Sequence, residues 1–177
     1  MMRRKTMTAC AAALAACATL SAAAARPNFS GTWELDQSQS HSIPTNMKQT
    51  MTVAHEGDRV SVETKIITPQ GERTQSDAYT LDGKESEFTP PAPQGPNAPP
   101  AGSPPAKGKR SARWLPNDAG FVVEEEITQP APQGKGMETV NVARKWRMWP
   151  DGTVSIEIMT QSPRGEFNSK RVFVKKQ

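Results

Sequence analysis

The chain is poor in reactive side chains. Its 177 residues include two cysteines and two histidines, and both cysteines, Cys10 and Cys17, stand near the N-terminus. The histidines, His41 and His55, are not at the close spacing of a metal-binding pair. The sequence also has no Ser-His-Asp arrangement and no glycine-rich phosphate loop. We therefore expect no catalytic residue, no metal and no cofactor, which excludes most enzyme classes.

The N-terminus has the pattern of an export signal. Three basic residues stand at positions 3 to 5, and positions 6 to 25 are uncharged, rich in alanine and end in four alanines. A basic start, an apolar stretch and small residues at the cleavage site, in this order, are typical of a secretory signal peptide. Residues 1–25 are predicted to be removed, leaving residues 26–177 as a periplasmic or secreted domain.

Cys17 makes a second mature form of the protein possible. Leu14-Ala15-Ala16-Cys17 has the form of a lipobox, in which the cysteine is acylated and becomes the new N-terminus. Alanine-rich signals match such a four-residue pattern easily, so we favour cleavage near Ala25 and a soluble product. The alternative is a domain anchored in the cell envelope by a lipid at Cys17. In the soluble product no cysteine remains, and its stability has to come from an ordinary core.

The mature domain lacks a surplus of charge. The whole chain has 22 basic and 18 acidic residues, and three of the basic ones belong to the predicted signal, which leaves a net charge of about +1. Local basic clusters occur at 107–110 and 144–147, and the second is interleaved with Trp146. Nucleic-acid binding requires a clustered positive surplus. We therefore expect no nucleic-acid partner, and we interpret both clusters as solvated surface.

Dense turn sequences divide the mature domain into strand-length segments. Turns such as Glu56-Gly57-Asp58 and Pro150-Asp151-Gly152 combine glycine with Asn, Asp or proline. Between them apolar and polar residues alternate, most clearly along 60–66, as in strands with one buried face. We predict strands at 29–35, 48–55, 59–68, 73–81, 110–115, 121–128, 138–148, 153–161 and 168–175. The short connections indicate an antiparallel up-and-down meander, and closing it into a barrel would remove its exposed edges.

A proline-rich segment interrupts this meander. Residues 89–108 contain eight of the 16 prolines together with glycine, alanine and serine. This composition cannot bury a core and favours a flexible or extended loop. It is either a lid or docking arm, or an insertion without a function, because long surface insertions are tolerated at low cost.

The two ends of the mature domain carry motifs of a known family. Gly31-x-Trp33 lies in the first predicted strand, and Lys170-Arg171-Val172-Phe173-Val174 forms the last. Both resemble the lipocalin and fatty-acid-binding-protein (calycin) families, here as a bacterial exported member. The resemblance implies a β-barrel of eight to ten strands, with Trp33 plugging one end and Arg171 over its indole. Where fatty-acid-binding proteins have a carboxylate-binding Arg-x-Tyr pair, this chain has Arg171-x-Phe173.

Alternation also points charged side chains into the predicted barrel. Glu125 shares an inward face with Phe121 and Val123, and Arg144 shares one with Trp146. A buried charge is costly unless it is paired, so Glu125 and Arg144 bind either each other or a ligand, unless a bulge turns them outward.

Two functions remain open for the predicted barrel. The first is that of a monomeric, non-catalytic protein that binds a small apolar or amphipathic ligand. The candidate ligand-binding residues are Glu125, Arg144, Trp146 and Arg171. The alternative is an interaction module of the cell envelope with a filled core, which uses the proline-rich loop or the barrel rim. An open cavity would favour the first function, and an interior packed with side chains would favour the second.

The cleavage site can be tested with an alkynyl fatty acid fed to cells that express the protein. We expect no label on the wild-type protein and a mature N-terminus close to Ala25, read by mass spectrometry. A Cys17→Ala variant should be exported and processed in the same way. Label on the wild-type protein that the Cys17→Ala variant loses would instead establish the lipid anchor.

Overall fold

The structure is a computed structural model that describes residues 26–91, 102–116, 119–131 and 136–176. The predicted signal peptide with Cys10 and Cys17, and half of the proline-rich segment, lie outside these residues. The described residues contain ten strands and no helix, so no helix among them could span a membrane. The strands are β1 (Gly31–His41), β2 (Lys48–Glu56), β3 (Arg59–Thr68), β4 (Gly71–Thr80), β5 (Ser86–Phe88), β6 (Lys107–Trp114), β7 (Gly120–Pro130), β8 (Met137–Met148), β9 (Val154–Ser162) and β10 (Gly165–Lys175).

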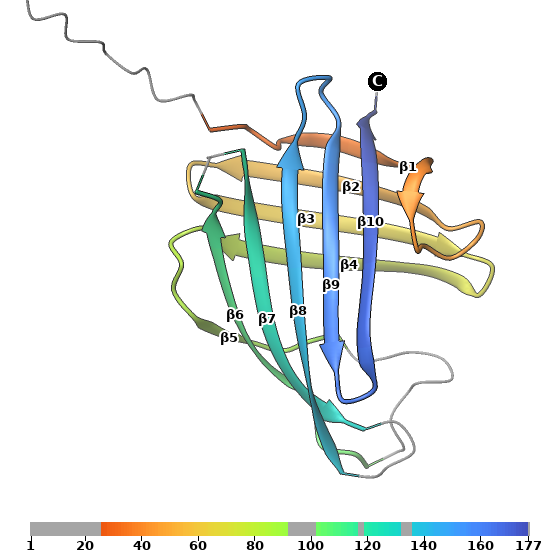
Figure 1. Ribbon diagram of the computed structural model, residues 1–177, viewed down its shortest axis with the longest axis vertical. Helices are drawn as coiled ribbons and strands as arrows, with labels where there is room; N and C mark the ends of the chain where they lie inside the picture. The colour runs from red at the N-terminus through yellow and green to blue at the C-terminus, as the bar shows by residue number, and fades with distance from the viewer. Residues whose placement is uncertain (1–25, 92–101, 117–118, 132–135, 177) are drawn as a thin grey trace, which may run out of the picture.

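All ten strands belong to one antiparallel sheet. Its order is β4-β3-β2-β1-β10-β9-β8-β7-β6-β5, so neighbours along the chain pair with each other, except β4 and β5, and the first strand pairs with the last. The sheet curls on itself, so that β2 to β4 and β7 to β10 cross each other as two layers (Figure 1). This confirms the predicted all-β meander of eight to ten strands. The pairing follows from short hairpin turns, which bring sequential strands side by side.

The curled sheet stays open on one side. β4 and β5 are the two ends of the strand order, and they do not pair with each other. A single isolated bridge between Asp82 and Arg113 links the two ends by backbone pairing. Side chains therefore connect β4 with β6, among them the ion pair between Asp77 and Arg110.

The predicted strands differ from the observed ones mainly around the proline-rich segment. β5 was missed because it has only three residues, of which two are polar and exposed. β6 begins at Lys107, within the range predicted as loop, and β1 extends to His41 beyond its predicted end at residue 35. Pairing with a neighbouring strand, rather than local sequence, sets these boundaries.

Aromatic side chains fill one end of the barrel. Phe121 stacks on Trp146 with ring centres 5.2 Å apart, and Phe29 meets Phe121 edge to face at 5.1 Å. Phe29, Phe121 and Phe173 are fully buried. The core cluster also contains Trp33, Met51, Val53, Val60, Val62, Tyr79, Leu81, Ala112, Val123, Val154 and Ile156. This end of the barrel therefore has the packed interior of a stable core, in keeping with a domain that has no disulfide.

Trp33 lies within this packed end. It is 2% exposed, and its Nε1 donates a hydrogen bond of 2.9 Å to the carbonyl oxygen of Phe29. The cation near its ring is Lys175, whose Nζ lies 5.7 Å from the ring centre. Gly31 has a φ of 138°, and a Cβ there would lie 3.0 Å from the Lys175 side chain. The implied place of Arg171 over the indole is wrong, because Lys175 is there and Arg171 points into the barrel.

Replacing Trp33 tests whether this end holds the fold together. Trp33→Ala should lower the free energy of unfolding by about 3 to 5 kcal/mol, because it leaves a cavity and an unused carbonyl acceptor. Urea denaturation measures the loss. Trp149→Ala is the matched control, since Trp149 is 40% exposed and its removal should cost clearly less. Equal losses in the two variants would contradict the role assigned to Trp33.

Candidate functional site

A cavity of about 210 Å³ lies between the two layers, next to the filled end. Strict alternation along β2, β3, β4, β8, β9 and β10 points every second side chain into it. The apolar lining consists of Met51, Val62, Ile66, Val142, Trp146, Ile156 and Ile158. The polar lining consists of Gln49, Thr64, Arg73, Gln75, Asp77, Tyr79, Arg144, Thr160 and Arg171. The cavity is therefore amphipathic, with an unusual number of arginines for a barrel interior.

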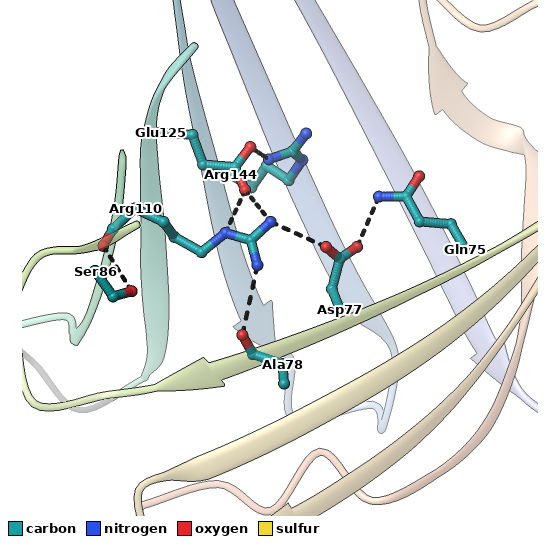
Figure 2. A network of polar contacts seen from close by, with 7 residues as sticks. All are labelled: Gln75, Asp77, Ala78, Ser86, Arg110, Glu125 and Arg144. Carbon is teal, nitrogen blue, oxygen red and sulfur yellow. Dashed lines mark hydrogen bonds and ion pairs between the residues drawn. The ribbon is translucent and has the colours of Figure 1, made fainter. Parts of the chain in front are cut away.

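Glu125 on β7 is the buried centre of an ionic network beside this cavity (Figure 2). Its side chain is 2% exposed, and it pairs with two arginines. One carboxylate oxygen, Oε1, lies 2.6 Å from the Arg110 guanidinium, and Oε2 accepts a hydrogen bond from Nη1 of Arg144. Both arginines are themselves largely shielded, with side chains 11% and 28% exposed. A single buried carboxylate thus holds two cations inside the barrel.

Arg110 carries this network across the open side of the sheet. From β6 it reaches β4, where its Nη2 lies 3.0 Å from Asp77 Oδ1 and its Nη1 donates to the carbonyl oxygen of Ala78 (Figure 2). The guanidinium lies 4.0 Å from the ring centre of Phe88 and 4.9 Å from that of Tyr79. Ion pairs and cation–π contacts therefore join the unpaired ends of the sheet. Burial raises the pKa of Tyr79, so its hydroxyl stays protonated.

Arg171 on β10 has no such counter-ion. Its Nη1 donates a hydrogen bond of 2.9 Å to Gln49 Oε1, a neutral acceptor. Its Nε is buried without a partner among the described residues. Burial, followed by the positive charges of Arg144 and Arg73, lowers the pKa of Arg171 to about 10. The side chain is still protonated at neutral pH, so a partly buried cation lines the cavity with a hydrogen bond to a neutral amide and no ion pair among the described residues.

A second unused donor belongs to another residue of the cavity lining, Trp146. The indole Nε1 of Trp146 is buried and has no hydrogen-bond partner among the described residues. Buried polar groups are nearly always satisfied, by protein, by water or by a ligand. Trp146 and Arg171 thus each bring to the cavity lining one buried donor that has no acceptor among the described residues.

The cavity has a positive balance of charge. Two carboxylates, Asp77 and Glu125, stand at or beside it. They face four arginines, namely Arg73, Arg110, Arg144 and Arg171. Because Glu125 and Asp77 are engaged by Arg110 and Arg144, the unmatched charges are those of Arg171 and of Arg73, which is exposed at the rim. An anion is the group that this arrangement lacks.

The structure brings most of the predicted ligand-binding residues together. Arg144, Trp146 and Arg171 line one cavity, and Glu125 lies directly behind Arg144. The ion pair between Glu125 and Arg144, one of the two predicted alternatives, is present. Whether these residues bind a ligand stays a prediction.

Sequence reasoning missed the contribution of β4 and of Arg110. Alternation along Arg73, Gln75, Asp77 and Tyr79 could have placed all four on one inward face. Arg110 was interpreted as part of a solvated basic cluster. Only the crossing of β6 past β4 brings its guanidinium to Asp77.

The buried histidine has a structural role. His55 Nδ1 accepts a hydrogen bond of 3.2 Å from the backbone N–H of Phe29, and its Nε2 lies 2.9 Å from the carbonyl oxygen of Gly57. It thereby fixes the segment that leads into β1. The described residues contain no cluster of three or more His, Cys, Asp or Glu side chains that could hold a metal ion.

Comparisons with known proteins find only distant similarities in structure. No protein-family model and no curated protein matches the chain. It is similar to zebrafish ileal bile acid-binding protein, crystallised with cholic acid, at 13% identity and a TM-score of 0.46, over 84% of this chain and 98% of that one. It is also similar to secretory abundant heat soluble protein 4 from Ramazzottius varieornatus, at 16% identity and a TM-score of 0.44, over 86% and 97%. Likenesses this distant do not indicate which molecule the chain binds.

Neutralising Glu125 should destabilise the fold. Glu125→Gln keeps the size of the side chain but leaves two shielded arginines without their carboxylate, which should cost about 3 to 5 kcal/mol of unfolding free energy. Its neighbour Glu124 provides the control, because it is 49% exposed and pairs with Arg113 on the surface. Glu124→Gln should cost about 1 kcal/mol or less. Urea denaturation compares the two, and a Glu125→Gln variant as stable as wild type would show that the network is not needed.

Proposed function

We propose that this chain is a non-catalytic, exported, lipocalin-like protein that binds a small amphipathic acid inside its barrel. The acidic group is held by Arg171 and the apolar part lies against the aliphatic lining of the cavity. In this proposal the domain acts as a monomer in the periplasm or outside the cell, or at the envelope if Cys17 carries a lipid.

The single observation that carries this proposal is the unmatched charge of Arg171. Its lowered pKa means that the folded protein holds the protonated guanidinium at a cost, and a ligand carboxylate would remove that cost. A carboxylate also supplies the acceptors that Nε of Arg171 and Nε1 of Trp146 lack. Gln49 already orients the guanidinium through its 2.9 Å contact.

The apolar lining supports a ligand with a hydrocarbon part. Ile156 and Ile158 on β9 flank Arg171 along the inner face, with Val142 on β8 beyond them. Ligand sites in proteins commonly combine such apolar walls with a few convergent polar groups. A purely polar anion would leave this surface without a partner, so an amphipathic acid fits the lining best.

Arg171→Met tests the proposal, because it removes the charge and keeps much of the volume. We expect the affinity for octanoate, measured by titration calorimetry, to fall by about ten- to a hundredfold, the loss of a charged hydrogen bond. The unliganded variant should be at least as stable as wild type, because an uncompensated buried cation has been replaced by an apolar side chain.

Arg113→Met is the matched control for that experiment. Arg113 lies on the outer face, paired with Glu124 at 3.0 Å, so octanoate binding should not change. Equal affinities of the Arg171→Met variant and wild type would refute the anchoring role of Arg171. Native mass spectrometry that finds no bound amphipathic acid, together with no octanoate binding to wild type, would refute the function itself.

A second candidate function is that of an interaction module that uses its outer surface. A groove of about 530 Å³ crosses the outer face of β7 to β10, lined in part by Met159, Lys145 and Lys170. Trp149 and Met159, each 40% exposed, lie on the same face. The filled end of the barrel agrees with this candidate as well. This candidate function predicts that the Arg171→Met variant still binds its partner.

A further inference from the structure

β4 is a long open edge of the sheet. It stands at one end of the strand order and is the outermost strand of its layer (Figure 1). Its pairing with β3 runs from Gly71 to Thr80 without a bulge. The strand at the other end of the order, β5, has only three residues and therefore offers little to pair with. The ten regular residues of β4 offer a much longer edge.

Every second residue of β4 directs its backbone groups away from β3. The carbonyl oxygen of Ala78 points to the free side, because it accepts a hydrogen bond from Arg110 on β6. The N–H and C=O groups of successive residues alternate between the two edges of a strand, so those of Glu72, Thr74 and Ser76 point the same way as those of Ala78. These three residues are exposed, and their outward backbone groups have no partner among the described residues.

β4 lacks the usual protection of an edge strand. Natural edge strands commonly avoid pairing through proline, lysine, a bulge or a covering element. β4 contains neither proline nor lysine, and its register is regular. Arg110 reaches β4 at Asp77 and Ala78, but the half from Gly71 to Ser76 has no neighbouring strand on its free side among the described residues. This half can therefore accept one more strand.

The charges on this half of β4 favour an acidic partner. Arg73 is exposed on the inner face and forms no ion pair among the described residues. Glu72 on the outer face is already paired with Lys65 at 2.8 Å. An added antiparallel strand would place one side chain directly opposite Arg73 in a non-hydrogen-bonded pair, where side chains come closest. An aspartate or glutamate there would be attracted to Arg73, and a lysine would be repelled.

A second copy of β4 fits this edge less well. Residues with outward backbone groups have to face one another across the new pairing. Two copies that pair within Gly71 to Ser76 would therefore place Arg73 opposite Gly71, Arg73 or Gln75. None of these side chains neutralises Arg73, so a foreign strand that carries an acid suits the edge better.

We propose that the edge of β4 from Gly71 to Ser76 accepts an extended segment of a partner protein as an additional antiparallel strand, with an acidic side chain opposite Arg73. Backbone hydrogen bonds to Glu72, Thr74 and Ser76 hold the segment, and the acidic side chain selects it. This inference goes beyond the proposed function and does not depend on the binding of an acid in the cavity.

Two synthetic peptides probe the edge. Each is a capped strand of about seven residues in which threonine and valine alternate, with either glutamate or lysine at the central position. NMR titration of the mature protein should show binding of the glutamate peptide. The lysine peptide should bind about two- to thirtyfold more weakly, because a cross-strand attraction becomes a repulsion.

Hydrogen exchange in the same samples locates the bound peptide. The amide hydrogens of Thr74 and Ser76 should exchange rapidly in the free protein, and about tenfold or more slowly once the glutamate peptide is bound. The amide hydrogen of Gln75 points to β3 and should exchange slowly in both states.

Arg73→Glu reverses the charge that selects the peptide, so this variant should bind the lysine peptide more tightly than the glutamate peptide. Lys48→Glu is the matched control. It changes the net charge by the same amount, but Lys48 is exposed on β2, two strands away from β4. Its preference should stay that of wild type.

Thr74→Pro tests the backbone bonds. It removes an outward N–H that the fold does not use, so thermal melting should stay close to that of wild type, while peptide binding should fall about tenfold or more. Gln75→Pro is the contrasting variant, because it removes an N–H that is bonded to β3. It should lower the melting temperature clearly.

Failure of this inference is distinguishable from failure of the proposed function. If wild type binds neither peptide, or if the amides of Thr74 and Ser76 are as protected as that of Gln75 in the free protein, the inference is overturned, whatever octanoate binding shows. Equal binding of the two peptides by wild type would overturn the selection by Arg73. Sedimentation that finds a wild-type dimer, dissociated by Thr74→Pro, would assign the edge to a second copy and overturn the foreign partner.

Discussion

The pairing of Glu125 with Arg110 and Arg144 is the constraint on which the rest of the site depends. A carboxylate that is 2% exposed would be costly alone, and so would either arginine. Together they form a network that also reaches Asp77 on β4, across the side where the sheet has no backbone pairing. The network joins the ends of the curled sheet, and it satisfies every buried charge near the cavity except one.

That exception is Arg171, and it leaves the cavity with an unpaired positive charge. Arg144 has a carboxylate, whereas Arg171 shares its space with Gln49 and with two further arginines that repel it. If the barrel interior served stability alone, an apolar residue at this position would make the fold more stable. Retaining a protonated guanidinium there is a cost to the unliganded fold, and the binding of an anion is the interaction that would offset it.

One end of the barrel provides stability, and the other end contains the candidate binding site. Phe29, Trp33, Phe121 and Phe173 close one end with dense aromatic packing, so the fold does not need disulfides. The other end has arginines and a short apolar wall. Because the packed end carries the folding energy, the open end can keep uncompensated donors without loss of the fold.

The sequence by itself determined the class of fold and, where alternation is clear, the inward face of a strand. Turn residues at short intervals and alternation along segments such as 60–66 predicted the antiparallel meander, because turn geometry and side-chain period are local properties. The same alternation placed Glu125, Arg144 and Trp146 inside. It could not tell whether Glu125 and Arg144 meet each other or a ligand, nor that Lys175 and not Arg171 lies near Trp33.

Only the tertiary structure decided these contacts, because they join residues that are far apart in sequence and depend on how the layers cross. Arg110 meets Asp77 from a strand on the other side of the proline-rich segment, and Gln49 on β2 meets Arg171 on β10, 122 residues away in sequence. The curl of the sheet sets these distances, and the pattern of a single strand does not encode it. Which of the inward charges remains unpaired therefore became visible only in the folded barrel.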